Sequence, residues 1–302
     1  MMAAMRLPPL ALRGQLTRNE PMSRHTSWRV GGPADLWYQP ADLDDLANFI
    51  AGLPAEEPLT WVGLGSNLLV RDGGIRGTVI ATAGRLDGME RFDATGLRVG
   101  AGVYCAKVAR FAAGADLVGA EFLAGIPGTL GGALAMNAGA FGGETWPIVE
   151  AVRTIDRRGV IRRRTPEDYQ IGYRSVQGPG GEWFVSADLR LSEGDGGAAR
   201  ERIRELLNRR GQTQPTQQPS CGSVFRNPPG DHAARLIEAA GLKGYRIGQA
   251  QVSEKHANFI INLGAAQAAV LEALVEHVRT VVRDKHGVSL VHEVRMIGEA
   301  AL

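Results

Sequence analysis

Cysteine, long apolar runs and an excess of either charge are all scarce in this 302-residue chain. Its two cysteines, Cys105 and Cys221, are too few for a disulfide framework, which fits a reducing compartment such as the cytoplasm. No run of about 18 apolar residues occurs, and residues 1–15 lack the unbroken apolar segment of a signal peptide. We therefore expect a cytoplasmic protein that is neither secreted nor inserted into a membrane.

The sequence also lacks the motifs that are typical of several functional classes. The formal net charge of +2, from 34 Lys and Arg against 32 Asp and Glu, provides no field to attract nucleic acid. The six histidines show no H-x-x-x-H spacing, and the two cysteines form no C-x-x-C motif. The sequence therefore lacks the spacings typical of zinc sites, and we assign no metal. A P-loop sequence is absent, which disfavours a nucleoside triphosphatase, and Ser66 and Ser223 lack the G-x-S-x-G context of a hydrolase nucleophile.

Glycine, by contrast, is abundant, at 40 of 302 residues or about 13% against an ordinary ~7%. Residues 125–143, GIPGTLGGALAMNAGAFGG, hold seven glycines in 19 positions and no charge. Because glycine costs backbone entropy in a regular element, we expect neither helix nor strand here, but a loop that a large, partly anionic ligand approaches closely. A tight crossover in the core, with glycines for packing, would explain this run equally well.

A second glycine loop, GLGSN at residues 63–67, lies between two β-rich runs. Both loops offer backbone N–H groups that suit phosphate oxygens. The G-x-G sequence at Gly100 and Gly102 has Cys105 in place of the third glycine of a dinucleotide fingerprint, so we discount it. A dinucleotide cofactor spanning the two loops at 63–67 and 125–143 is the economical interpretation.

The pattern of predicted elements changes near residue 195, and the last hundred residues are expected to form a separate α+β domain. Residues 192–199, SEGDGGAA, are expected to form a flexible boundary. The predicted elements are strand, turn and strand over 26–40, a capped helix from Asp42 to Leu53, a strand, turn and helix over 97–117, hairpin strands over 151–164 and 182–191, helices at 199–210 and 265–286, and short strands at 258–262 and 292–298.

Three polar residues stand in contexts that would bury or fix them. Arg174, in IGYRSV, is suited to hold a substrate carboxylate, although a surface arginine is the simpler interpretation. Ser223 lies between prolines that fix its loop, where a capping serine is equally well explained. Glu293 interrupts an apolar strand and faces either solvent or a buried cation.

The chain resembles the family of UDP-N-acetylenolpyruvoylglucosamine reductases, flavoenzymes of bacterial peptidoglycan synthesis. The resemblance runs from about residue 25 to residue 299 in the family's order. It rests on the segments HTSWRVGGPAD, VGLGSNLLV, GIPGTLGGALAMNAGAFGG, YRS, PSCGSVFRNP, SEKHANFIIN and HEVRMIG.

The resemblance implies a fold and a domain order. It predicts an α+β protein with a vanillyl-alcohol-oxidase (PCMH) type FAD-binding domain of two α+β subdomains, followed by a C-terminal α+β substrate domain. The implied parts are an N-terminal segment at 1–28, an FAD-binding domain at 29–195 with subdomains at about 29–85 and 86–195, and a substrate-binding domain at 199–302.

The resemblance also implies the reaction. NADPH gives a hydride to non-covalent FAD, which reduces the enolpyruvyl group of UDP-N-acetylglucosamine enolpyruvate to UDP-N-acetylmuramate. Hydride addition leaves an enediolate that needs positive charge and a proton. By the match, Arg174 and Glu293 stabilise this intermediate, and Ser223 donates the proton to the alpha carbon.

Further residues are implied by the same match. Those assigned to FAD are Gly63, Gly65, Ser66, Asn67, Leu68, Gly125, Ile126, Pro127, Gly128, Thr129, Gly131, Gly132, Asn137 and Arg295. Those assigned to the UDP-sugar or to NADPH are Tyr173, Arg226, Asn227, Lys243, Lys255 and His256. The expected partners are these small molecules, with no nucleic acid, no membrane insertion, and a monomer or weak oligomer.

The sequence departs from the family pattern in a few places. Val176 stands where a serine is common, and Gln249 and His25 replace a frequent glycine and asparagine. Only eight residues separate Arg174 from Trp183, too few for the tyrosine-bearing loop of one branch, so the second-type branch is the better match. Another FAD-dependent oxidase of the same fold, or a flavin-binding module without turnover, are the alternative functions.

Overall fold

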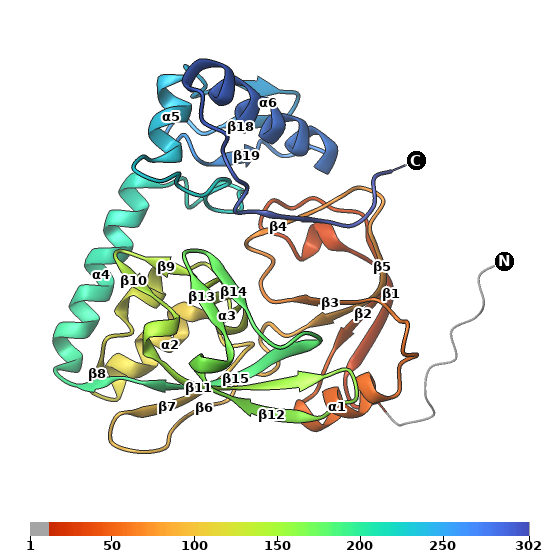
Figure 1. Ribbon diagram of the computed structural model, residues 1–302, viewed down its shortest axis with the longest axis vertical. Helices are drawn as coiled ribbons and strands as arrows, with labels where there is room; N and C mark the ends of the chain where they lie inside the picture. Colours follow the sequence, from red (N-terminus) through yellow and green to blue (C-terminus); the bar gives the residue numbers. More distant parts are fainter. Residues whose placement is uncertain (1–11, 302) are drawn as a thin grey trace. The chain divides into compact units, whose positions relative to one another are not determined.

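The computed structural model describes residues 12–301, which form two compact units (Figure 1). Residues 1–11, on which part of the expectation about a signal peptide rests, lie outside the described residues. Unit 1 comprises residues 12–18, 36–63 and 77–204, and unit 2 comprises residues 19–35, 64–76 and 205–301.

The described residues form both α-helices and short 3-10 helices. The predicted capped helix is confirmed, because the Asp42 carboxylate accepts a hydrogen bond from the backbone N–H of Asp45 at 2.9 Å. Gly287, which directly follows the helix predicted at 265–286, ends α6 with φ of 70°. The α-helices are α1 (Leu43–Ala51), α2 (Cys105–Gly114), α3 (Leu130–Met136), α4 (Gly196–Thr213), α5 (Ala233–Ala239) and α6 (Ala268–His286), and the 3-10 helices are Met22–Arg24, Glu121–Gly125, Trp146–Ile148 and Pro166–Asp168.

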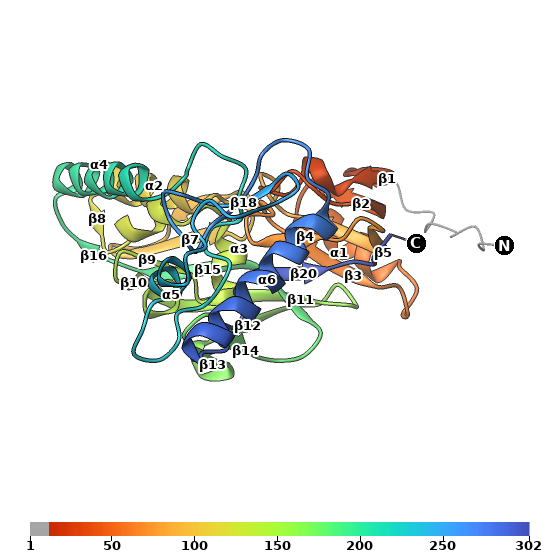
Figure 2. The ribbon, with the colours of Figure 1, turned by 90° about the horizontal axis from the view of Figure 1, so that it is seen from above.

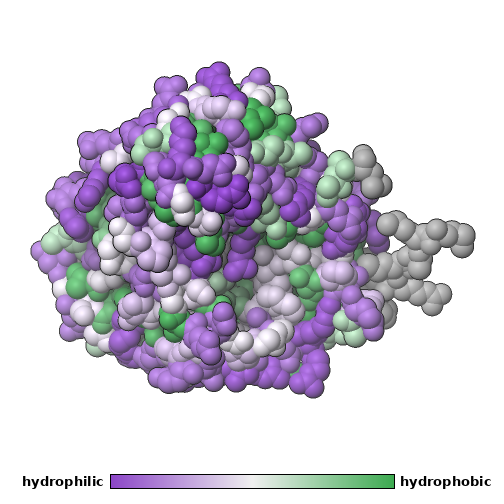
Figure 3. Space-filling view, turned by 45° about the horizontal axis from the view of Figure 1, so that its top comes forward, coloured by the Kyte–Doolittle hydropathy of each residue, from purple (hydrophilic) through white to green (hydrophobic). Residues whose placement is uncertain are grey.

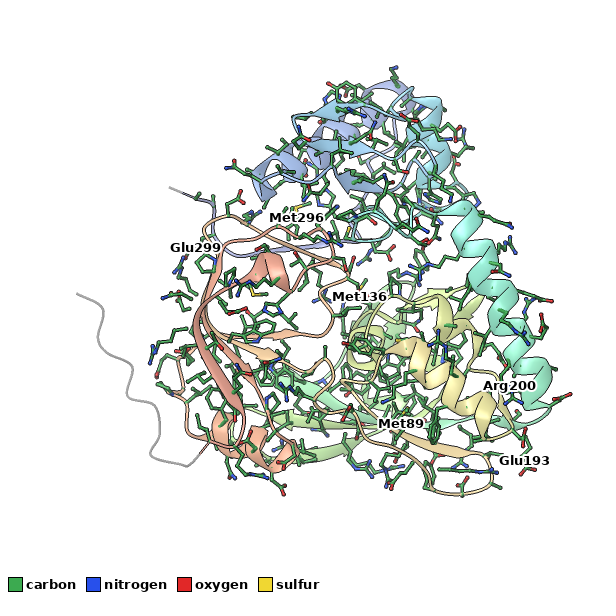
Figure 4. All side chains as sticks on the ribbon, turned by 180° about the vertical axis from the view of Figure 1, so that it is seen from behind. Met89, Met136, Glu193, Arg200, Met296 and Glu299 are labelled. Atoms are coloured by element: carbon green, nitrogen blue, oxygen red, sulfur yellow. The ribbon has the colours of Figure 1, made fainter. Side chains whose placement is uncertain are left out.

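A five-stranded antiparallel sheet forms the centre of unit 1. Its order is β12-β11-β15-β7-β6, and α2 and α3 lie on one face of it (Figure 1). Arg200 at the start of α4, labelled in Figure 4, donates a hydrogen bond to the carbonyl of Ala113 in α2 at 3.0 Å. The strands are β6 (Met89–Arg91), β7 (Gly96–Gly100), β11 (Val149–Asp156), β12 (Ile161–Arg164) and β15 (Glu182–Arg190).

The other strands of this part of the chain belong to smaller sheets. A four-stranded sheet has the order β1-β2-β5-β3, with bounds β1 (Gln15–Pro21), β2 (Pro33–Gln39), β3 (Leu59–Val62) and β5 (Ile75–Ala81). Two-stranded sheets pair β8 (Leu117–Val118) with β16 (Ser192–Glu193), β9 (Gly139–Ala140) with β10 (Gly143–Glu144), and β13 (Gln170–Gly172) with β14 (Ser175–Gln177).

Unit 2 combines a three-stranded sheet, two helices and one parallel strand pair. The sheet has the order β17-β18-β19, with β17 (Arg246–Ile247), β18 (Ala250–Val252) and β19 (Ile260–Asn262). The strands β4 (Leu68–Val70) and β20 (Arg295–Ile297) pair in parallel, and Figure 2 shows them side by side. Trp28 belongs to the same core as α5 and α6, is fully buried, and donates its indole N–H to the carbonyl of Ile260 at 2.7 Å.

Three local predictions from the sequence are wrong, each because tertiary contacts override local preference. The expected strand at 26–30 is absent, since Trp28 turns into the core of unit 2. The segment 192–199 is ordered, because Ser192–Glu193 is a strand and the Asp195 carboxylate caps α4 through the N–H groups of Gly197 and Ala198.

The third error concerns the glycine-rich segment, which contains helix α3 despite its glycines. Thr129 caps this helix, and its hydroxyl accepts from the N–H of Gly132 at 3.4 Å. A Cβ on Gly131 would lie 3.0 Å from the Ala101 side chain, so the glycine lets the helix approach the neighbouring turn. Close packing thus offsets the entropy that glycine costs in a helix.

The compact units do not coincide with the expected domain boundaries. Residues 19–35 and 64–76 pack with the C-terminal hundred residues, whereas the sequence places them in the N-terminal segment and the FAD-binding domain. As a division into functional domains, 1–28, 29–195 and 199–302 stays a prediction.

No helix within residues 12–301 combines the length and the apolar composition needed to span a bilayer. On the face shown in Figure 3, hydrophilic residues predominate and hydrophobic residues form small separate patches. In the same residues, no three His, Cys, Asp or Glu side chains gather in a group that could hold a metal ion.

Candidate active site

The first glycine loop joins β3 to β4 and is pressed against the backbone of residues 25–27. Gly65 has φ of 67°, and a Cβ there would lie 1.9 Å from the carbonyl oxygen of His25. The carbonyl of Gly65 accepts a hydrogen bond from the N–H of Ser27 at 3.1 Å. This position therefore requires glycine both for its conformation and for the close approach.

The same loop presents backbone donors that the protein does not use. Within residues 12–301, the N–H groups of Leu64, Gly65 and Ser66 and the Ser66 hydroxyl donate to no acceptor. Gly65 is buried, and buried N–H groups in folded proteins almost always have a partner. Consecutive unpaired N–H groups form an anion-binding concavity, so the loop fits a pyrophosphate.

Asn67 and Leu68 connect this loop to the last strand of the chain. The Asn67 side-chain amide donates to the carbonyl of Glu293 at 3.0 Å, and the N–H of Arg295 donates to the carbonyl of Asn67 at 3.0 Å. In the parallel pair of β4 and β20, Arg295 is opposite Leu68. Met296, labelled in Figure 4, follows in the same strand. Unit 2 thus brings together four predicted site residues, Asn67, Leu68, Glu293 and Arg295.

Ser223 lies beside Glu293 in the same unit. The N–H of Glu293 donates to the carbonyl of Val224 at 2.8 Å. On the other side, the buried Asn258 amide exchanges two hydrogen bonds with the backbone of Phe225, at 3.0 and 2.8 Å. Ser223 is half-buried, and its hydroxyl has no hydrogen-bond partner within residues 12–301. The loop is therefore fixed while the hydroxyl is available to a ligand.

The two cysteines are not nucleophiles. Burial raises the pKa of the Cys105 thiol to about 12. Burial, together with the charge of Glu293, raises the pKa of the Cys221 thiol well above its usual range. Both groups stay protonated at neutral pH, and only the thiolate is reactive.

The second glycine run has a different role in the structure from the first. Its amides are mostly used within the protein: those of Gly128, Leu130 and Gly131 donate to backbone carbonyls at 2.8 to 2.9 Å. A Cβ on Gly125 would lie 2.3 Å from the Phe141 ring, and one on Gly63 would lie 2.3 Å from the Thr129 hydroxyl. The packing explanation therefore accounts for part of this run, and Pro127 and Gly132 remain exposed.

Arg174 occupies the turn of the β13–β14 hairpin in unit 1. Gly172 pairs with Ser175, so Tyr173 and Arg174 form the two-residue turn, and Arg174 has φ of 52°. Its guanidinium donates to the carbonyls of Asn137 at 3.3 Å and Gly139 at 3.0 Å. The same group lies 5.1 Å from the centre of the Tyr173 ring. The predicted residues Asn137, Tyr173 and Arg174 are thus assembled within one unit.

The predicted substrate residues of unit 2 have unequal environments. Arg226 has a buried Nε, and His256 a buried Nδ1, with no hydrogen-bond partner within residues 12–301. Burial lowers the pKa of His256, which favours the neutral imidazole. Lys255 donates to the carbonyl of Gly211, whereas Lys243 is paired with Glu238 at 2.8 Å and Asn227 accepts from the N–H of Ala233 at 3.1 Å.

Comparison with known proteins gives consistent matches over nearly the whole chain. Residues 34–165 match the family model described as an FAD binding domain, and residues 214–297 match the C-terminal domain of UDP-N-acetylenolpyruvoylglucosamine reductase. Reductases of that name from Alkalilimnicola ehrlichii and Methylococcus capsulatus are each 62% identical to the chain. The alignments cover 95% of this chain and 96% and 95% of theirs. The crystal structure of the Thermus caldophilus reductase matches with a TM-score of 0.78 at 34% identity, covering 94% of this chain and 98% of that one.

The chain belongs to the UDP-N-acetylenolpyruvoylglucosamine reductase family. The predicted family, the α+β fold with an FAD-binding domain, and the predicted class of FAD-containing oxidoreductase are thereby confirmed. FAD as cofactor, NADPH as co-substrate and a role in peptidoglycan synthesis follow from the same membership.

The sequence did not reveal residues that hold other predicted site residues in place instead of contacting a ligand. Asn258 fixes the Ser223 loop, and Glu144 accepts a hydrogen bond from the Asn137 amide at 3.0 Å. No spacing or motif distinguishes these residues in the sequence.

The first glycine loop can be tested by Gly65→Ala, with Gly84→Ala as its control. Both glycines have φ of 67°, but Gly84 has no heavy atom within 4 Å of an added Cβ. Each substitution costs about 1–2 kcal/mol of backbone strain, and only that at Gly65 adds a clash. We expect Gly65→Ala to lose most of its bound FAD and Gly84→Ala to retain it, as measured by the flavin absorbance of purified protein. Equal FAD content in the two variants would contradict this role of the loop.

Proposed function

We propose that this chain reduces UDP-N-acetylglucosamine enolpyruvate to UDP-N-acetylmuramate with Arg174, Glu293 and Ser223 as its catalytic residues. Family membership supports the reaction. The observation that supports the residues is the fixed junction of Glu293 with the Ser223 loop, next to the unpaired amides of residues 64–66. When bound, FAD supplies the hydride transfer, with NADPH as the source of electrons.

The residues present fit FAD as a non-covalent cofactor. The unpaired N–H groups of Leu64, Gly65 and Ser66 suit the negative charge of the pyrophosphate. The exposed residues Pro127 and Gly132 make the second glycine run accessible to the rest of the cofactor. In this proposal the cofactor residues are Gly63, Gly65, Ser66, Asn67, Leu68, Gly125, Ile126, Pro127, Gly128, Thr129, Gly131, Gly132, Asn137 and Arg295.

Arg174 and Glu293 act on the charge that develops in the substrate. Addition of hydride to the terminal alkene carbon delocalises negative charge into the adjacent carboxylate. A guanidinium held in place by backbone carbonyls, as Arg174 is, meets that charge without reorganising. Glu293, fixed through its own N–H, supports the same intermediate.

Ser223 completes the reaction by giving its proton to the alpha carbon of the intermediate. Its hydroxyl has no partner within residues 12–301, so it is available to donate. A serine is a weak acid in water, and a positioned acid contributes typically ~100- to 10,000-fold to a rate. The fixed geometry of the loop at Val224 and Phe225 supports this role.

Replacement of Ser223 tests the proton-transfer step. We expect Ser223→Ala to be reduced by NADPH at about the wild-type rate but to pass the hydride to the enolpyruvyl substrate at least ~100-fold more slowly. Anaerobic stopped-flow absorbance separates the two half-reactions. Ser220→Ala, three residues earlier in the same loop, serves as the control and should change neither rate. A normal second half-reaction in Ser223→Ala would exclude Ser223 as the proton donor.

Substrate binding is assigned to six polar residues. The proposed contacts with the UDP-sugar or with NADPH are made by Tyr173, Arg226, Asn227, Lys243, Lys255 and His256. Lys255 is exposed and has an ammonium that donates to a neutral carbonyl, which leaves its charge available for a diphosphate.

Replacement of Lys255 tests diphosphate binding. A hydrogen bond to a charged group is worth about 1.5–3 kcal/mol, so we expect Lys255→Ala to raise the KM for the UDP-sugar about 10- to 100-fold with FAD content unchanged. Lys285→Ala is the matched control, because this exposed lysine also donates to a backbone carbonyl, that of Ala240, at 2.8 Å. Steady-state kinetics with UDP-sugar as the varied substrate measure the KM of both variants. Unchanged KM values in Lys255→Ala would remove Lys255 from the binding site.

We further propose that the domains divide at 1–28, 29–195 and 199–302, with FAD held by the second and substrate by the third. A cytoplasmic location and a monomeric or weakly oligomeric state complete the proposal. The two free, buried cysteines, which form no disulfide, support the location.

A further inference from the structure

The carboxyl-terminal half of the glycine-rich segment contacts the guanidinium of Arg174 and accepts its hydrogen bonds. Asn137 follows Met136, which is labelled in Figure 4 at the end of α3, and it caps this helix with φ of 47°. Its carbonyl and that of Gly139 accept the two hydrogen bonds from Arg174. A Cβ on Gly139 would lie 3.2 Å from Nη1 of Arg174, so this glycine leaves space for the guanidinium.

The Asn137 side chain is fully engaged within the protein. It is buried, with 2% of its surface exposed. Its amide nitrogen donates to Glu144 at 3.0 Å and to the carbonyl of Gly172 at 3.2 Å, and its oxygen accepts from the N–H of Trp146 at 3.1 Å. These bonds connect the end of α3 with the base of the hairpin turn that carries Arg174.

Glu144 sets the orientation of this amide. An ionised carboxylate only accepts hydrogen bonds, so it selects the nitrogen of Asn137 and leaves the oxygen for Trp146. Glu144 also pairs with Gly139 in the β9–β10 hairpin, which carries one of the two carbonyls that bind Arg174. Both carbonyls are thus placed by a network that includes Glu144.

We propose that Asn137 and Glu144 are positioning residues that hold Arg174 in place for the substrate carboxylate, a role of the Asn137 side chain beyond the proposed place of Asn137 beside FAD. This inference rests on the role proposed for Arg174. It assigns the segment 137–144 to substrate chemistry, separately from the preceding residues 125–132.

Variants of Glu144 provide the test, in the FAD-loaded enzyme. A displacement of about 1 Å at a reacting group costs up to ~100-fold in rate, so we expect Glu144→Ala to slow reoxidation by the enolpyruvyl substrate about 10- to 100-fold. Reduction by NADPH should stay within about twofold of wild type. Glu144→Gln keeps an oxygen acceptor for Asn137 and should restore the reoxidation rate to within about threefold. Asn137→Asp loses both donated bonds, tolerates positive φ, and should behave like Glu144→Ala.

Controls separate this inference from a general structural effect and from the proposed function. Glu150→Ala removes another partly exposed carboxylate of unit 1, which pairs with Arg190, and should change neither half-reaction. If Glu144→Ala slowed both half-reactions equally or lost FAD, the role would be structural and the inference overturned. If Arg174→Ala slowed reoxidation strongly while Glu144→Ala and Asn137→Asp did not, this inference alone would fail. A normal Arg174→Ala would instead overturn the proposed function.

Discussion

The backbone hydrogen bonds of residues 293–297 are the constraint on which the chemistry of unit 2 depends. This short segment bonds to Val224 through the N–H of Glu293, and to Asn67 through the N–H of Arg295. It continues as β20, parallel to β4. A single extended stretch therefore sets the Ser223 loop and the first glycine loop in register with each other. A one-residue shift along β20 would displace Glu293 from the serine, and because side chains alternate in a strand, it would also reverse the directions of the side chains in β20.

Glycine has a different structural role in each of the two glycine-rich segments. Around Gly65, glycine permits a positive φ and a close backbone contact, and the unpaired amides that result suit an anion. In residues 125–143, most amides already have partners in the protein, and the glycines make room for Phe141, Ala101 and Arg174. Glycine enrichment alone therefore does not distinguish a ligand cradle from a packing crossover. Only the partners of the N–H groups separate the two.

Local patterns predicted a large part of the fold. The strands on both sides of the first glycine loop are β3 and β4, and the hairpin strands predicted over 151–164 are β11 and β12. The helix predicted within 97–117 is α2, which buries Val108, Ala109, Ala112 and Ala113. These elements follow from periodicity and turn residues close in sequence, which are the signals that a single sequence carries.

Contacts between segments far apart in the sequence could not be predicted from these local patterns. The bond from Trp28 to Ile260 joins residues 232 positions apart and explains why residues 19–35 pack with the C-terminal segment. The positive φ of Arg174 is likewise imposed by the hairpin, and arginine has no preference for this conformation. Arg174, Ser223 and Glu293 were assigned through family resemblance. The residues alone favoured a surface position for Arg174 and for Glu293, and explained Ser223 equally well as a capping serine.

The most direct test of this account is the visible spectrum of the purified holoenzyme under anaerobic conditions. The account predicts flavin absorbance that bleaches on addition of NADPH and recovers when UDP-N-acetylglucosamine enolpyruvate is added, with UDP-N-acetylmuramate as the product. Bleaching without recovery on addition of this substrate would contradict it. So would a protein that ignores NADPH and consumes oxygen with an alcohol substrate.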